Sequence, residues 1–135
     1  MRLQADQGAG PNARLRARTR LTMANWPGDI EVAAFMAARL ADNAARHGKP
    51  FSDDRIILRL TVMKETRDLV IAADDAEPSF PNFAEVSHGF ASTESGLWWI
   101  NRNGGRVSWH LKQDEGGPVL GKTVQAFVSV EGKRA

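Results

Sequence analysis

The clearest pattern along the chain is a helical one between Ile30 and His47. Apolar residues recur there every three or four positions, which is the spacing of one face of a helix. Asp29 precedes this segment as a candidate N-cap, and Gly48 and Pro50 follow it as stop signals. The pattern predicts an amphipathic helix over this stretch.

The segment before this helix alternates instead. From 15 to 23, leucine, alanine and methionine share every second position with Thr19, and arginine fills most of the others, which predicts an edge strand. Residues 1–13 are polar, contain Gly and Pro and show no period, so we expect a flexible N-terminal tail. Four arginines cluster here: Arg14, Arg16, Arg18 and Arg20. The alternation favours placing them on one solvated face of the strand, and contact with nucleic acid phosphates is the weaker alternative.

Two pairs of strands are expected after the long helix. Residues 55–63 and 68–73 are rich in Ile, Leu and Val, and the four residues between them suit an antiparallel hairpin. Residues 107–112 and 122–130 form a second pair across the glycine-rich loop 114–121.

Periodicity is lost between these pairs, over residues 74–95, whose prolines and small polar residues are typical of a mobile lid. A short helix should run from Gly96 to about Asn101. The order of elements predicts an α/β two-layer sandwich with a mixed, mostly antiparallel sheet and helices on one face. We expect one domain over 14–131, followed by a C-terminal tail over 132–135.

Composition excludes several kinds of chemistry. The 135 residues contain no cysteine, which excludes disulfides, zinc-thiolate sites and thiol nucleophiles. No apolar run approaches the roughly 20 residues that a membrane span needs, and no signal core is present, so we expect a cytoplasmic protein. The net charge of only +2 gives no reason to expect nucleic acid or membrane as a partner.

Residues 116–123 (GGPVLGKT) satisfy the phosphate-loop pattern G-x-x-x-x-G-K-[ST]. That mechanism needs a helix directly after the loop, so that backbone N–H groups meet the phosphates. The residues after Thr123 are β-branched and alternating, like a strand. We therefore interpret this segment as a hairpin loop.

Two groups of residues are candidates for chemistry. On the long helix a stripe recurs every four residues, made of Phe35, Arg39, Asn43 and His47. Asparagine inside a helix costs a few tenths of a kcal/mol relative to alanine, which favours a functional reason, although a solvated polar edge explains the spacing equally well. The pair Asp74 and Asp75 ends an apolar strand, where carboxylates usually form turns.

Four segments with these residues occur in the order and spacing of a known family. They are RLADNAARHG (39–48), VIAADDAEPSFP (70–81), SGLWWINRNGGRVSW (95–109) and GKTVQAFV (121–128). Together they resemble the histidine-kinase-like ATPase (Bergerat or GHKL) fold, over about residues 15–130. More narrowly, they are similar to small actinobacterial ATP-binding regulatory proteins related to anti-sigma-factor serine kinases.

The resemblance implies a role for several residues. Asn43 would help to hold a magnesium ion that bridges the ATP phosphates, since magnesium prefers oxygen ligands. Asp75 would accept a hydrogen bond from the adenine amino group, and Thr123 would support the same base edge. Gly96, followed by Leu97, would let the backbone approach the phosphates.

The remaining positions in the four segments either differ from the family pattern or are weaker candidates for ligand binding than the residues named above. The resemblance makes residues 83–95 the ATP lid, and His47 ends the helix beside the site in a structural role. Asp74 stands where relatives carry a small hydroxyl residue, so it is a second-ranked ligand. Arg39 replaces the glutamate that serves as general base; a guanidinium cannot take a proton but can pair with a phosphate. Glu94 replaces a glycine near the phosphates.

These observations lead to one hypothesis and two alternatives. The first is an ATP-binding regulatory protein that holds a sigma factor or its antagonist, with weak or no catalysis and with homodimer formation left open. The second is an active serine/threonine kinase with another base, although Glu31 and Asp42 lie too far round or along the helix. The third is an interaction domain without a nucleotide, with Trp98 or Trp99 marking the partner surface.

Overall fold

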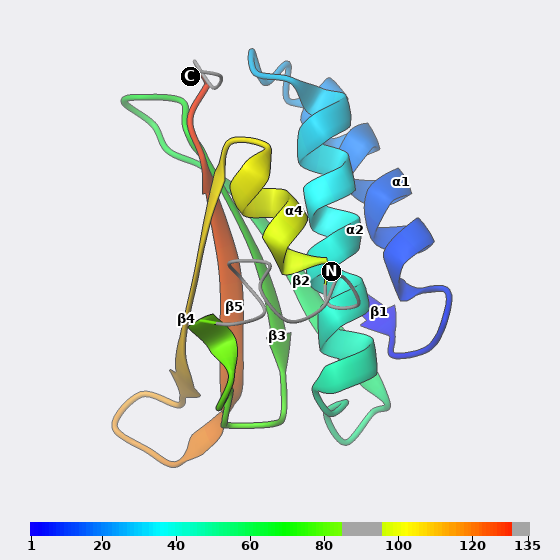
Figure 1. Cartoon of the computed structure of the whole chain (residues 1–135), viewed down its shortest axis with the longest axis vertical. Coiled ribbons are helices and arrows are strands. Elements are labelled where there is room, and N and C mark those ends of the chain that lie inside the picture. Colours follow the sequence, from blue (N-terminus) through cyan, green and yellow to red (C-terminus); the bar gives the residue numbers. More distant parts are fainter. Residues whose placement is uncertain (85–95, 131–135) are drawn as a thin grey trace.

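The chain forms an open sheet of five strands with its helices packed on one face (Figure 1). The computed structural model describes residues 1–84 and 96–130. The elements, in chain order, are β1 (Arg2–Gln4), α1 (Ala9–Met23), α2 (Ile30–His47), β2 (Arg55–Val62), β3 (Leu69–Asp75), α4 (Leu97–Arg102), β4 (Gly105–Gln113) and β5 (Val119–Val128). The strand order is β1-β2-β3-β5-β4, and every neighbouring pair is antiparallel, which confirms the predicted two-layer α/β fold.

The N-terminal part of the chain differs from the prediction. Residues 15–23 belong to α1 and not to a strand, and residues 1–13 are not a tail but form β1 and the start of α1. Leu15 and Met23, which the alternation placed on a common face with Leu21, are 60% and 80% exposed. The buried face follows a four-residue spacing instead, through Ala9, Ala13, Ala17 and Leu21. Small alanine side chains let α1 lie close against α2, so packing stabilises this helix.

The long helix α2 is confirmed with the predicted ends. The Asp29 side chain caps it by accepting a hydrogen bond from the N–H of Val32 at 3.2 Å. The N–H of Gly48 donates to the carbonyl of Ala44 at the other end. The apolar face of α2, which includes the fully buried Met36, belongs to the core between the sheet and the helices.

Both strand pairs are confirmed. β2 pairs with β3, and β4 pairs with β5, each in antiparallel register. The predicted hairpin between β4 and β5 is confirmed, but its loop is shorter than expected: residues 116–118 lie in the connection, and residues 119–123 already belong to β5. The short helix expected from Gly96 is α4, with Gly96 at its N-cap.

Some expectations fall on residues outside the described part of the chain. These are the central lid residues with Glu94, within 85–95, and the C-terminal tail, within 131–135. In the described ranges, 1–84 and 96–130, no helix has both the length and the apolar character needed to cross a bilayer.

Candidate functional site

The two carboxylates at the end of β3 point to opposite faces of the sheet, because side chains alternate along a strand. Asp75 lies opposite Lys122 in the register and shares the helix-covered face with the core residue Ala73. Asp74 lies opposite Thr123, whose hydroxyl donates a hydrogen bond to Asp74 Oδ1 at 2.7 Å. The structure thus separates Thr123 from Asp75, which the resemblance had placed on one base edge.

Asp75 is a fully buried carboxylate with one free oxygen. Its Oδ1 accepts from Lys122 Nζ at 3.1 Å and from the N–H of Glu77 at 2.8 Å. Its Oδ2 is buried and has no hydrogen-bond partner. Burial raises the pKa of Asp75 above its ordinary value. The backbone N–H groups of Glu77 and Lys49 and the charge of Lys122 lower the pKa, but burial outweighs them. Oδ2 therefore keeps an unused capacity to accept a hydrogen bond.

Gly48, directly after α2, allows this carboxylate to lie against the helix end. A Cβ at Gly48 would overlap the carboxylate carbon of Asp75. Only glycine therefore permits the observed approach of the two segments. His47, the last residue of α2, is exposed, and its position at the helix C-terminus suits a structural role.

Lys122 is a functional candidate that the sequence reasoning missed. Its side chain is 4% exposed, and Nζ donates to Asp75 and, at 3.2 Å, to the carbonyl of Glu77. Nζ also lies 5.5 Å from the ring centroid of Phe80. The inward-facing Val124, two residues further along β5, carried the missing signal, because strand alternation then turns Lys122 inward and Thr123 outward.

Asn43 lies on α2 and is also buried, at 4% exposure. Its side-chain amide makes no hydrogen bond with any residue of the described ranges. It precedes Gly48 by five residues, or about 7.5 Å along the helix at 1.5 Å per residue. The amide oxygen is a suitable ligand for magnesium. Within the described residues no group of three or more His, Cys, Asp or Glu could hold a metal.

Arg39 lies one turn before Asn43 and contacts α4. Gly96 has a φ of 76°, and a Cβ there would lie 2.7 Å from Cδ of Arg39. The guanidinium carbon is 5.0 Å from the ring centroid of Phe35 and 5.5 Å from that of Trp99. Its Nε is buried without a partner. Leu97 is fully buried in the core and anchors α4.

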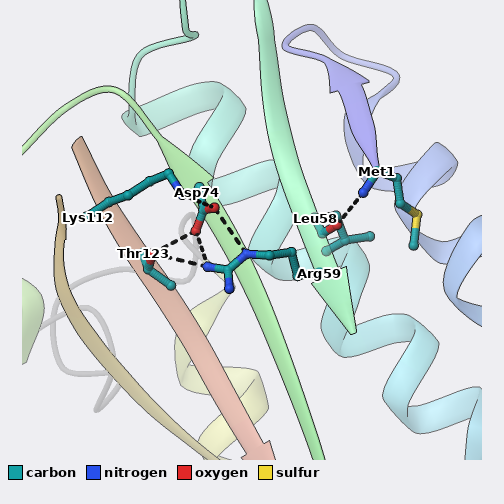
Figure 2. A network of polar contacts seen from close by, with 6 residues as sticks. All are labelled: Met1, Leu58, Arg59, Asp74, Lys112 and Thr123. Carbon is teal, nitrogen blue, oxygen red and sulfur yellow. Dashed lines mark hydrogen bonds and ion pairs between the residues drawn. The ribbon is translucent and has the colours of Figure 1, made fainter. Parts of the chain in front are cut away.

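Asp74, by contrast, is fully engaged, as Figure 2 shows. Arg59 donates to both of its oxygens, from Nε at 3.1 Å and from a terminal nitrogen at 2.6 Å, and Lys112 Nζ lies 3.1 Å from Oδ2. Burial alone would raise the pKa of Asp74, but the hydrogen bonds from Arg59, Thr123 and Lys112 outweigh it and hold the pKa below the ordinary value. This network joins four strands on the face away from the helices, which indicates a structural role.

Comparison with solved structures identifies the fold. The chain matches the histidine kinase domain of the blue-light activated histidine kinase from Erythrobacter litoralis, with a TM-score of 0.50 and 16% identity over 76% of this chain and 45% of that one. Another structure of this kinase matches with a TM-score of 0.49 and 17% identity, over 76% of this chain and 32% of that one. No protein-family model matches the sequence, and no curated protein matches it.

The fold is therefore similar to that of a histidine kinase domain, with an open antiparallel sheet covered by helices on one face. At 16% identity the likeness establishes the fold alone. The chain spans less than half the length of these neighbours, at 45% and 32% of their chains.

Proposed function

We propose that the protein is an ATP-binding regulatory protein that acts by holding a protein partner, with weak or no catalysis. The observation that carries the proposal is the unpartnered Oδ2 of Asp75, on the helix-covered face of the sheet. An unpaired buried acceptor costs about 1–3 kcal/mol. A hydrogen bond from the exocyclic amino group of adenine would recover that cost.

The candidate residues form a row that suits the rest of the nucleotide. Gly48 touches Asp75, and Asn43 and Arg39 precede it on α2, so the row spans about 13 Å of helix. With the base at Asp75, the magnesium and phosphates would lie near Asn43, and Arg39 and Gly96 would face the far phosphates. When bound, magnesium would neutralise phosphate charge, and the Asn43 oxygen would orient it.

Weak or absent catalysis is supported by the surroundings of α2. Arg39 occupies the place of a general base and cannot accept a proton. The two other carboxylates considered as a base are both held in ion pairs: Glu31 pairs with Arg18 at 3.0 Å, and Asp42 pairs with Arg46 at 3.2 Å. No observation favours an active serine/threonine kinase, and we do not propose one.

The partner and the location are also part of this proposal. The resemblance implies a sigma factor or its antagonist as the partner, in the cytoplasm, and leaves homodimer formation open. The competing function is an interaction domain that has lost its nucleotide. The buried Lys122 ion pair is the one observation in its favour, because it already neutralises Asp75.

Isothermal titration with ATP and magnesium tests the proposal. The wild type should bind, and Asp75→Asn should weaken binding about tenfold, because a charge-assisted hydrogen bond becomes a neutral one. Asn43→Ala should weaken the magnesium-dependent binding of ATP.

Asp74→Asn is the matched control, because it makes the same chemical change one residue away on the opposite face. Its affinity for ATP should stay close to that of the wild type, with folding checked by circular dichroism. Absence of heat at millimolar ATP would contradict the proposal and favour the domain without a nucleotide, and equal losses in the two aspartate variants would contradict the assigned site.

A further inference from the structure

A groove of about 590 Å³ runs between α1 and α2. The two helices meet closely at small residues beside it. A Cβ on Gly10 would lie 3.4 Å from the carbonyl oxygen of Ala38. The lining on α1 extends from Gly10 to Arg18, which is about 12 Å of helix. The groove is thus long enough for about two helical turns of another chain. Figure 1 shows the two helices side by side.

Part of the lining is apolar. It includes Leu15 and Phe35, together with Pro11 and Ala38. Leu15 is 60% exposed. An exposed leucine beside an aromatic ring is a suitable contact for an apolar side chain of a partner.

Three arginines also line the groove. The guanidinium carbon of Arg14 lies 5.1 Å from the ring centroid of Phe35, and that of Arg39 lies 5.0 Å from it. Neither arginine forms an ion pair with a carboxylate of the described residues. Arg18 also lines the groove, and its partner Glu31 is 58% exposed. Asp42, the acidic residue of the lining, pairs with Arg46.

We propose that this groove binds an acidic segment of a partner protein. Carboxylates of the segment would pair with Arg14 and Arg39, and an apolar side chain would cover Leu15. Charge complementarity calls for an anionic occupant, and the apolar part of the lining favours a peptide over a free anion, which would leave Leu15 uncovered. The proposal rests on the partner-holding half of the proposed function. Arg39 is common to this groove and to the proposed phosphate site, whereas Arg14 belongs to the groove alone.

Fluorescence anisotropy with the full chain and a labelled peptide, (Glu-Glu-Leu)₄, tests this docking. We expect binding of this peptide and none of (Lys-Lys-Leu)₄. Arg14→Glu should weaken binding at least about tenfold, because it replaces an attractive contact with a repulsive one. The matched control is Arg16→Glu, an equal change in charge two residues away on the same helix and outside the lining, which should leave affinity within about twofold of the wild type.

Four results would overturn the proposal. They are absence of peptide binding at millimolar concentration, equal losses in the Arg14 and Arg16 variants, tighter binding of oligo(dT) with the same dependence on Arg14, and a dimer in sedimentation that Arg14→Glu dissociates. The third would assign the groove to single-stranded nucleic acid and the fourth to a second copy of the chain. ATP titration of Arg14→Glu separates the two proposals, because this variant should keep the nucleotide affinity of the wild type.

Discussion

Two adjacent aspartates have opposite surroundings in this protein. Both carboxylates are fully buried, but Asp74 has hydrogen bonds to both oxygens, whereas Asp75 keeps one oxygen free. The pKa is accordingly lowered for Asp74 and raised for Asp75. This contrast assigns stability to the first residue and leaves the second available for a ligand.

Asp74→Asn should destabilise the fold by about 2–3 kcal/mol near neutral pH, since it removes charge-assisted hydrogen bonds from a buried site. The native pKa lies below the ordinary value of 3.8, so the stabilisation by this carboxylate is present above pH 3.8 and is lost as the pH falls through the native pKa. Urea unfolding of the wild type and the variant at pH 7 and in strong acid measures the difference. A destabilisation that is equal at both pH values would contradict the structural role of the charge.

Sequence reasoning reached only part of the site. Asn43 was identifiable because asparagine is unusual inside a helix, whereas the choice of Asp75 over Asp74 came from the resemblance, since the strand pattern treats both as turn residues. The partner Lys122 was missed because the resemblance assigned the base edge to its neighbour Thr123. A shift of one residue along a strand exchanges the two faces, so only the register placed Lys122 beside Asp75.

At the scale of elements, α1 is the instructive case. Two periods coincide in its sequence, because Ala17 and Leu21 fit both a two-residue and a four-residue spacing. Ala9 and Ala13 continue the four-residue spacing of the buried residues, so they indicate a helix. Alanine is a weak hydrophobic signal, however, and both residues lie in the segment that was expected to be a tail. The four later strands were predictable because Ile, Leu and Val recur in them. α2 was predictable because its apolar residues, many of them alanine, keep the helical spacing over about five turns between the Asp29 cap and Gly48.

Leu21→Ala and Leu15→Ala together test the helical register of α1. As a helix, α1 buries Leu21 and exposes Leu15, so we expect a loss of about 2–5 kcal/mol for Leu21→Ala and of less than about 1 kcal/mol for Leu15→Ala. A strand would place both leucines on one face. Chemical unfolding of the two variants gives the answer, and similar losses would contradict the helix.

At the scale of the whole molecule, helices cover one face of the sheet, and that arrangement separates the candidate surfaces. The seam of α2 with β3 holds Asn43 and Asp75, and the opposite face holds the Asp74 network (Figure 2). The layers were predictable from alternating strands and one amphipathic helix. The groove was not, because it exists only where α1 packs as a helix on α2.

ATP should bind in the seam between α2 and β3, and side-chain NMR during a titration with ATP and magnesium measures this binding. Asn43 and Gln125 carry side-chain amides that report the two faces, since Gln125 lies on β5 outside the helix-covered core, with its amide donating to Ser108 at 3.4 Å. We expect a saturable shift of the Asn43 amide resonances, with those of Gln125 unchanged. A shift confined to Gln125, or no shift of Asn43 at millimolar ATP, would contradict it.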